Sequence, residues 1–347
     1  MTGKSAILPD NPRILVARTD RIGDVALSLP VFASIRRACP EAYICALARR
    51  YTSDLLTDRP DVDEVIAFDS DAGHVPRGVF FELLGKIKNK RFDAAIALFS
   101  NFSVAALLAL AGIPVRVGPA SKLAQVFFTH RVRQRRSKGL RHEADHNLDL
   151  LKTLGIPVSR QASIAPPREV SSPISVKTGG KPLVGVHPGS GGSSRNWPEK
   201  NYARLVAEIV DAGADVVVTG SPGERSLVER VAGASGRDPG IYTGSGGLRE
   251  LIAVLSRLDV FVASSTGPLH VASAVGTPVV GIYCPIFVCL PQRWGPIGAN
   301  DSALVPDVEP CDRCVGEKCA EWDCMEKVTV GRVRDEALGK IGSSVRH

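Results

Sequence analysis

Several features are scarce or missing in this 347-residue chain, and each absence excludes a class of protein. Phe, Trp and Tyr make up only 5% of the residues, and no zinc-finger spacing or basic–aromatic interleaving occurs, which argues against nucleic-acid binding. The longest uncharged stretches, 94–115 and 260–292, are broken by Gly, Pro and polar residues, so neither resembles a membrane-spanning helix. The first residues are polar and contain Pro, unlike a signal peptide. We therefore expect a cytoplasmic globular protein.

The segment at 184–206 carries neither of two common phosphate-binding motifs, the P-loop Gly-Lys-Ser/Thr and the dinucleotide fingerprint GxGxxG. A different phosphate-binding pattern is present at 184–206. There an apolar run leads into a loop rich in Gly and Ser, which contains Ser190, and then through Arg195 into a helical pattern. Glycines let backbone N–H groups approach an anion, and Arg195 adds a full positive charge. A simple turn is the alternative interpretation.

A second candidate anion site follows the apolar run 260–263. Ser265, Thr266 and Gly267 stand where a helix should begin, Pro268 lies just inside it, and His270 follows about one turn later. The N–H groups of a helix start favour anions. A capped helix with a half-buried His is the alternative interpretation, but two such sites in one half of the chain favour a nucleotide site.

The length suits two domains. Strand-like runs alternate with helical patterns in both halves, which predicts parallel sheets with helical crossovers. We therefore expect an α/β protein with two doubly wound, Rossmann-like domains and a ligand site beyond the carboxyl ends of the strands. The predicted boundaries are 1–165 for the first domain, 166–182 for a Pro-, Ser- and Gly-rich linker, 183–330 for the second domain and 331–347 for a C-terminal helix and tail.

The net charge of +7 and the pI near 9.0 favour anionic partners such as nucleotide sugars, phosphorylated lipids and the inner-leaflet surface. In the first half, Asp24 stands at a helix start after the strand at 14–17, with Asp20 beside it. Asp24 is either a helix cap or a carboxylate that accepts a proton from an attacking hydroxyl, and Asp20 is the rival for that role. The basic run 130–142 is either a solvated mobile loop or a docking segment for acceptor phosphates or an anionic leaflet.

The eight cysteines should be mostly reduced in a cytoplasmic protein. Four of them have a spacing that allows a structural metal site, free thiols or a redox-sensitive disulfide: Cys311, Cys314, Cys319 and Cys324. The other four lie in apolar surroundings and are expected to fill the core: Cys39, Cys45, Cys284 and Cys289.

With these motifs in place, nearly the whole chain resembles the lipopolysaccharide heptosyltransferases, glycosyltransferase family 9. The resemblance rests on the order and spacing of short motifs at 21–24, 29–30, 187–198, 265–270 and 324–325. It implies a GT-B architecture, with the acceptor on the N-terminal domain and the donor on the C-terminal one. It also implies inverting transfer of a heptose from an ADP-activated donor to a phosphorylated, lipid-linked core, with no metal ion or cofactor.

The resemblance also implies roles for particular residues. Asp24 matches the general base, Arg195 a cation on the donor phosphates, and Glu224 an acidic residue at the ribose. Ser265 stands where the family often has Asp, so the donor sugar is left open. The predicted donor-binding residues are Ser190, Arg195, Glu224, Ser265, Thr266, Gly267 and His270. The predicted acceptor-binding residues are Arg18, Arg21, Arg136 and Arg141.

Two other functions remain as alternatives. A sugar-nucleotide epimerase shares this fold but should have more carboxylates and histidines at its site, and a non-catalytic binding protein should have lost Asp24 or Arg195. A dinucleotide oxidoreductase is excluded by the missing GxGxxG. The acceptor position and the oligomeric state are not indicated by the sequence.

Overall fold

A computed structural model describes residues 8–70, 75–167, 170, 174, 180–192, 195–244 and 246–341. Its contacts divide the chain into two units. Unit 1 comprises Met1–Arg136 and Glu143–Ala162, and unit 2 comprises Ser137–His142 and Ser163–His347. Much of the predicted linker 166–182, the loop residues 193–194, the first seven residues and the tail after 341 lie outside the described residues.

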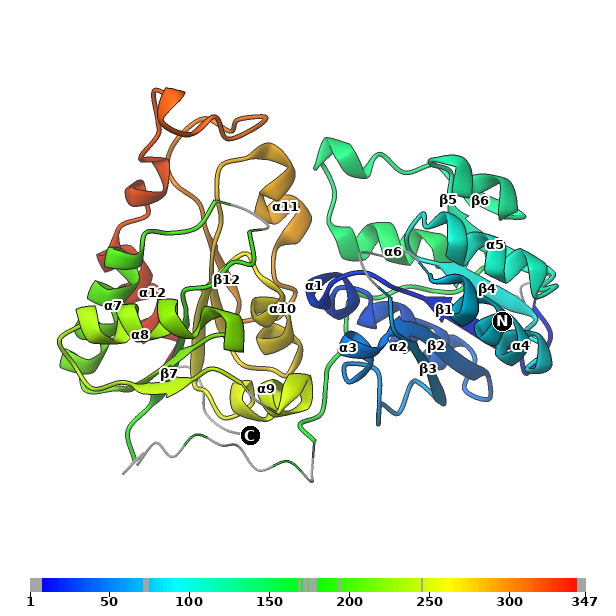
Figure 1. The fold of residues 1–347 in the computed structure, drawn as a ribbon, viewed down its shortest axis with the longest axis horizontal. Coiled ribbons are helices and arrows are strands. Elements are labelled where there is room, and N and C mark those ends of the chain that lie inside the picture. Colours follow the sequence, from blue (N-terminus) through cyan, green and yellow to red (C-terminus); the bar gives the residue numbers. More distant parts are fainter. Residues whose placement is uncertain are drawn as a thin grey trace. The chain divides into compact units, whose positions relative to one another are not determined.

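Unit 1 contains a six-stranded parallel sheet in the order β3-β2-β1-β4-β5-β6 (Figure 1). Its strands are β1 (Arg13–Ala17), β2 (Tyr43–Arg49), β3 (Glu64–Phe68), β4 (Ala94–Ala97), β5 (Val115–Pro119) and β6 (His130–Val132). Its helices are α1 (Ile22–Ala26), α2 (Leu29–Ala38), α3 (Arg50–Ser53), α4 (Arg77–Asn89), α5 (Phe102–Leu110) and α6 (Glu143–Lys152), with 3₁₀ turns η1 (Leu123–Phe127) and η2 (Arg136–Lys138).

Side-chain alternation along these strands decides which helices cover each face. Leu15 and Ala17 on β1, like Cys45 and Leu47 on β2, belong to a core shared with α4, α5 and η1. Helices α2 and α6 pack against each other, and they contact β2 and β5 respectively. Since both faces of the sheet are covered, its central strands are apolar throughout, as in other parallel sheets.

Unit 2 also contains a six-stranded parallel sheet, with the strand order β12-β11-β10-β7-β8-β9. Its strands are β7 (Leu183–His187), β8 (Asp215–Thr219), β9 (Gly240–Tyr242), β10 (Val260–Ser264), β11 (Val279–Ile282) and β12 (Ser302–Leu304). Its helices are α7 (Glu199–Asp211), α8 (Arg225–Ala234), α9 (Gly247–Leu255), α10 (Gly267–Ala274), α11 (Pro291–Trp294) and α12 (Val330–Ile341). The 3₁₀ turns are η3 (Pro222–Glu224), η4 (Phe287–Cys289), η5 (Gly316–Lys318) and η6 (Cys324–Lys327).

Both sheets have the same doubly wound topology. Counting from the first strand of each unit, both orders read 3-2-1-4-5-6, and the predicted α/β fold class is confirmed. The strand order reverses between β1 and β4 in unit 1 and between β7 and β10 in unit 2. Ligands of such sheets bind beyond the carboxyl ends of the strands at this reversal. The two predicted motifs of unit 2 and the Asp24 segment of unit 1 follow β7, β10 and β1, so all three lie at reversal points.

Two strands were missed by the sequence analysis. Residues 130–132, which were assigned to a charged loop or docking segment, form the edge strand β6 through pairing with β5. The edge strand β12 pairs with β11. Both are three residues long, which is too short to show an alternating apolar pattern.

Candidate functional site

The carboxyl end of β1 leads directly into the candidate catalytic segment. The ladder continues one residue past the strand, because the Arg18 N–H donates to Leu47 O at 3.0 Å and the Leu98 N–H donates to Ala17 O at 3.0 Å. This backbone pairing directs the Arg18 side chain into the interior of unit 1, where it is 1% exposed. A buried guanidinium must be paired and hydrogen-bonded, because removing it from water is otherwise costly.

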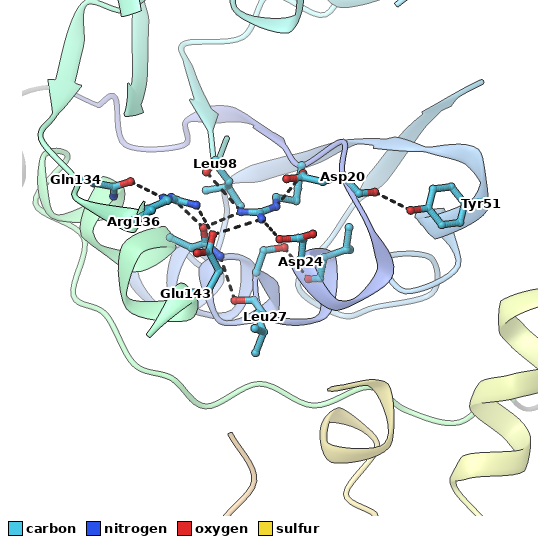
Figure 2. A network of polar contacts seen from close by, with 12 residues as sticks. Asp20, Asp24, Leu27, Tyr51, Leu98, Gln134, Arg136 and Glu143 are labelled. Atoms are coloured by element: carbon cyan, nitrogen blue, oxygen red, sulfur yellow. Dashed lines mark hydrogen bonds and ion pairs between the residues drawn. The ribbon is translucent and has the colours of Figure 1, made fainter. Parts of the chain in front are cut away.

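Two aspartates of the same segment pair with this guanidinium (Figure 2). Nε of Arg18 lies 3.0 Å from Oδ1 of Asp20, and NH2 lies 2.6 Å from Oδ1 of Asp24. Each aspartate side chain keeps 18% exposure. Arg18 thus fixes two partly accessible carboxylates beyond the strand ends.

The structure contradicts the helix-cap interpretation of Asp24. The N-cap of α1 is Arg21, and Asp24 lies in the first turn of the helix without capping it. Its Oδ1 accepts a hydrogen bond from Arg18. In the described part of the chain no hydrogen bond to its Oδ2 is found, so this oxygen is available to a proton donor.

Helix α6 supplies the other side of the Arg18 site (Figure 2). NH1 of Arg18 donates to Oδ1 of Asn147 at 3.0 Å, and NH2 lies 3.5 Å from Oε1 of Glu143. Asn147 also donates to Leu27 O at 3.2 Å. Arg136 pairs with Glu143 and donates to Asn147 at 3.3 Å, which connects the basic run to the same network.

The electrostatics of the network distinguish its members. Burial alone would lower the pKa of Arg18, but the carboxylates of Asp20, Asp24 and Glu143 raise it overall, so Arg18 stays charged. Burial raises the pKa of Asp20 from 3.8 to about 6, and the negative charges of Asp24 and Glu143 act in the same direction against the attraction of Arg18. Asp20 therefore changes its charge close to physiological pH.

The four arginines predicted to bind the acceptor lie in different environments. Arg18 is enclosed by its own partners, and Arg136 is paired with Glu143. Arg21 and Arg141 are exposed. Arg141 belongs to the segment that groups with unit 2, where His142 Nε2 lies 2.9 Å from Gly295 O.

In unit 2, the loop after β7 brings Gly189 against Glu224. A Cβ on Gly189 would lie 2.1 Å from Oε1 of Glu224, so a larger residue there would require the Glu224 carboxylate to move. Gly191 and Gly192 both have positive φ, at 55° and 68°, which glycine adopts without strain. Ser190 lies between these positions, and the predicted loop residues Ser193 and Ser194 fall outside the described residues.

Glu224 is held by its own turn in this structure. Its Oε2 accepts hydrogen bonds from Ser221 N at 2.9 Å and from Ser221 Oγ at 2.8 Å, forming a capping box. Burial would raise the pKa of Glu224, but these bonds, the nearby His187 and the Gly191 N–H lower it overall. The carboxylate is therefore ionised and lies beside the loop that follows β7. Its predicted contact with a ribose stays a prediction.

A buried polar cluster anchors this loop to the end of β10. Oδ1 of Asn196 accepts from Ser264 Oγ at 2.6 Å, from Tyr202 OH at 3.3 Å and from Trp197 N at 2.9 Å. Tyr202 OH and Ser264 Oγ are 2.8 Å apart. The sequence analysis did not single out these three polar side chains, and only their positions near the ends of β7 and β10 could have indicated them.

Arg195 points toward the cysteine-rich segment in this structure. Its guanidinium donates to the carbonyl oxygen of Trp322 and lies 3.4 Å from Cys314 Sγ. Its predicted role on donor phosphates stays a prediction, and it requires these contacts to be exchanged for phosphate oxygens.

The start of α10 leaves two buried polar atoms unsatisfied. Thr266 is the N-cap residue, yet its side chain makes no capping bond, and Pro268 stands in the first turn. Thr266 Oγ1 and His270 Nδ1 are buried and have no hydrogen-bond partner in the described part of the chain. Burial, aided by the nearby His142, lowers the pKa of His270 to about 3, so this ring is neutral. Because buried polar groups are usually hydrogen-bonded, these two atoms make the start of α10 a candidate place for a polar ligand.

The eight cysteines differ in exposure. Cys45, Cys284 and Cys324 are buried and Cys314 is exposed, while the others are intermediate. Among the described residues, no group of three or more His, Cys, Asp or Glu side chains is arranged to hold a metal ion. Cys284 lies just past β11, and a hydrogen bond from Cys289 together with backbone N–H groups lowers the pKa of its thiol to about 6.

Comparison with known proteins agrees with this geometry. The family model described as glycosyltransferase family 9 (heptosyltransferase) matches residues 80–324. The chain belongs to glycosyltransferase family 9. A Haemophilus influenzae protein with a provisional glycosyltransferase name is 33% identical over 310 residues, covering 84% of this chain and 88% of the relative. The family resemblance inferred from the motifs is therefore confirmed.

A second sequence match and a solved structure extend the comparison. Lipopolysaccharide heptosyltransferase 2 of Escherichia coli K12 is 25% identical over 291 residues, covering 79% of this chain and 83% of the relative. The solved structure of the E. coli ADP-heptose lps heptosyltransferase II matches with a TM-score of 0.76 at 20% identity, covering 95% of this chain and 99% of that chain. This likeness shows that the glycosyltransferase shares their GT-B fold. In the described part of the chain, no helix has the length and apolar character that crossing a membrane requires.

Proposed function

We propose that this family 9 glycosyltransferase transfers a heptose from an ADP-activated donor to a phosphorylated lipopolysaccharide core. The transfer would invert the anomeric centre and use no metal ion, in the cytoplasm at the inner membrane surface. The observation that best supports this proposal is the Asp24 carboxylate. One of its oxygens lies 2.6 Å from the buried Arg18 guanidinium, and the other is available to accept a proton. The relatives named for ADP-heptose and lipopolysaccharide support the choice of substrates.

The proposed chemistry uses Asp24 as the general base. The free oxygen of Asp24 takes the proton of the acceptor hydroxyl. The acceptor oxygen attacks the anomeric carbon, and the bond from this carbon to the diphosphate breaks. The ion pair with Arg18 fixes the carboxylate before the substrate arrives, so Arg18 is a positioning residue. Asp20 shares the same guanidinium and remains the rival base.

On the donor side, the developing negative charge of the diphosphate requires a cation or dipoles. The N-terminus of α10 supplies backbone N–H groups, and Thr266 and His270 supply the unpartnered polar atoms described above. Arg195 supplies the positive charge once it leaves the Trp322 carbonyl. These groups could replace a metal ion.

The test compares two variants of the same carboxylate pair. We expect Asp24→Asn to lower the rate of heptose transfer by about 10² to 10⁴ while ADP affinity stays unchanged, because a general base contributes about that much. Asp20→Asn should retain at least about a tenth of the rate, since it leaves the proposed base in place. Transfer is measured by mass spectrometry of a core oligosaccharide acceptor, and ADP affinity by calorimetry.

The opposite ranking of the two variants would assign the base to Asp20. Full transfer activity in Asp24→Asn would leave Asp24 with a structural role only. If neither ADP-heptose nor another ADP-sugar is consumed by the wild-type enzyme, the proposed donor is wrong.

A further inference from the structure

Unit 1 exposes a cluster of large apolar side chains that its core does not use. Phe99 is 39% exposed, Phe102 55%, Leu123 75% and Val126 60%. These four side chains are here called the 99–126 patch. They come from two segments that lie side by side, because Ser100 Oγ and Ser121 Oγ are 2.7 Å apart and the Phe102 and Phe127 rings are in edge contact at 5.2 Å. Large apolar side chains that are exposed together on neighbouring segments indicate a binding surface.

The local structure turns these side chains outward. Asn101 caps α5 by accepting from Val104 N at 3.2 Å, which leaves Phe102 at the first, solvent-facing helical position. In the 3₁₀ turn η1, residues three apart share a side. Leu123 and Val126 therefore point outward together, whereas Ala124 on another side is buried. The exposure follows from the backbone and is not an accident of one rotamer.

The charge around the patch has one sign. No Asp or Glu occurs between Asp93 and Glu143. Lys122 Nζ lies 4.9 Å from the centre of the Phe99 ring, and the Ala120 N–H donates to Val132 O at 2.7 Å, which places Arg133 beside the turn that carries Lys122. Lys122, Arg133 and Arg135 are exposed, and none of them forms an ion pair within the described ranges.

The patch and the candidate base lie at the same end of the unit 1 sheet, beyond the carboxyl ends of its strands. The patch follows the carboxyl ends of β4 and β5, and β4 neighbours β1 in the sheet. Leu98, the residue before the patch, accepts a long hydrogen bond of 3.5 Å from Arg18 NH1 through its carbonyl oxygen. Any surface that the patch touches is therefore brought toward Asp24.

We propose that the 99–126 patch, with Lys122 and Arg133, docks unit 1 on an anionic phospholipid bilayer. Apolar and aromatic side chains would enter the headgroup boundary while the unpaired cations meet lipid phosphates. The inference extends the proposed function, because a lipid-linked acceptor lies in such a surface. It differs from docking by the basic run 130–142 alone, since it rests mainly on residues 99–126.

Charge complementarity favours a bilayer over a second copy of this chain. In a two-fold symmetric dimer the same surface faces itself, so Lys122 and Arg133 of both copies would come together with no carboxylate between them. Like charges placed together in a desolvated interface oppose association. An anionic bilayer instead supplies phosphates across the whole patch.

The test is flotation of the full-length protein with vesicles of phosphatidylcholine, with or without phosphatidylglycerol. The wild type should bind the anionic vesicles. Phe102→Ser combined with Leu123→Ser should weaken this binding at least about tenfold, because two exposed apolar side chains are lost. Lys122→Gln combined with Arg133→Gln should weaken it by a similar factor on anionic vesicles only, because each cation near such a surface contributes about fivefold.

Matched controls come from the same unit. Leu110 is 61% exposed at the other end of α5, and Lys88 is exposed in the last turn of α4. Leu110→Ser and Lys88→Gln should bind vesicles like the wild type. Equal loss in the controls, or wild-type binding by both double variants, would overturn the proposal. If the wild type does not bind vesicles but forms a dimer, and the Phe102→Ser/Leu123→Ser variant is a monomer, the patch serves self-association.

Transfer to a delipidated, water-soluble acceptor separates this inference from the proposed function. Phe102→Ser combined with Leu123→Ser should keep wild-type turnover on that acceptor, because neither residue belongs to the proposed machinery. A wild type that binds vesicles but transfers no heptose would refute the proposed function and leave the docking surface standing. A wild type that transfers heptose but binds no vesicles would refute the docking surface alone.

Discussion

Replacing Asp20 by Asn should make unit 1 more stable at neutral pH, although it removes an ion pair with Arg18. Burial and two neighbouring carboxylates raise the pKa of Asp20 from 3.8 to about 6. Folding therefore disfavours its charged form in spite of the Arg18 Nε contact at 3.0 Å. Asn resembles the protonated acid in shape and carries no charge. Arg18 keeps Asp24 and Glu143 as partners after the substitution.

The size and pH range of the effect follow from proton linkage. A folded-state pKa above the unfolded one means that the group's stabilising contribution is complete below about pH 4 and is lost as the pH rises through about 6. One pKa unit corresponds to about 1.4 kcal/mol, so the ionised carboxylate costs at most about 3 kcal/mol at pH 7.5. Asp20→Asn should therefore gain up to about 3 kcal/mol over the wild type at pH 7.5 and almost nothing at pH 4.

Urea unfolding followed by circular dichroism at several pH values measures this difference. The three tryptophans, Trp197, Trp294 and Trp322, all belong to unit 2, so their fluorescence identifies the unit 2 transition and leaves the other transition to unit 1. Asp69→Asn is the matched control, because Asp69 pairs with Arg50 at 71% exposure and should show no comparable gain. A variant that is less stable than the wild type at pH 7.5, or a difference that does not grow between pH 4 and 7.5, would refute the reasoning.

Three further predictions concern the donor side. Arg195→Ala should weaken binding of the nucleoside diphosphate by about 1.5–3 kcal/mol in calorimetry. The control Arg204→Ala removes an exposed cation of α7 and should leave the affinity unchanged; equal affinity in both variants would place the phosphates elsewhere. Transfer should continue in excess EDTA, and elemental analysis and a Cys311→Ser/Cys314→Ser variant control for a structural metal in the tail. Activity that is lost in EDTA and restored by Mg²⁺ or Mn²⁺, with no tail metal detected, would contradict the metal-independent mechanism. Thr266→Val should not lower the melting temperature, because Oγ1 has no hydrogen-bond partner to lose among the described residues, but it should weaken ADP binding at least about fivefold. A lower melting temperature with unchanged ADP affinity would show that the hydroxyl is structural.

The fold was predictable because parallel strands buried on both faces are continuous apolar runs. The expected strand at 14–17 and the expected apolar run at 260–263 lie within β1 and β10 respectively. The edge strands β6 and β12 were not predicted. Each pairs with one neighbour only and is three residues long, so pairing stabilises it rather than its own apolar pattern.

The candidate site was predictable only in part, because its supporting contacts join residues far apart in the chain. The position of Asp24 after a strand indicated a site, but its partner Arg18 was expected to contact the acceptor. Glu143 and Asn147 lie more than a hundred positions further along, in a helix whose apolar pattern says nothing about polar contacts. Similarly, the Asn196–Ser264 bond spans two strand ends that become neighbours only when β7 pairs with β10.

Both reversal points contain buried polar atoms that lack a hydrogen-bond partner among the described residues, including Arg18 Nε and Asp20 Oδ1 in unit 1, which meet as an ion pair. The two points differ in whether the candidate group is held by the protein itself. In unit 1, Arg18 has its partners in Asp20, Asp24 and Asn147, so the proposed base is oriented whether or not a substrate is present. In unit 2, Thr266 Oγ1 and His270 Nδ1 are desolvated but unpaired within the described residues. A ligand that supplies hydrogen bonds to such atoms gains affinity without the cost of removing them from water. Unit 1 thus orients the proposed base in advance, and unit 2 offers unpaired polar atoms to the proposed donor.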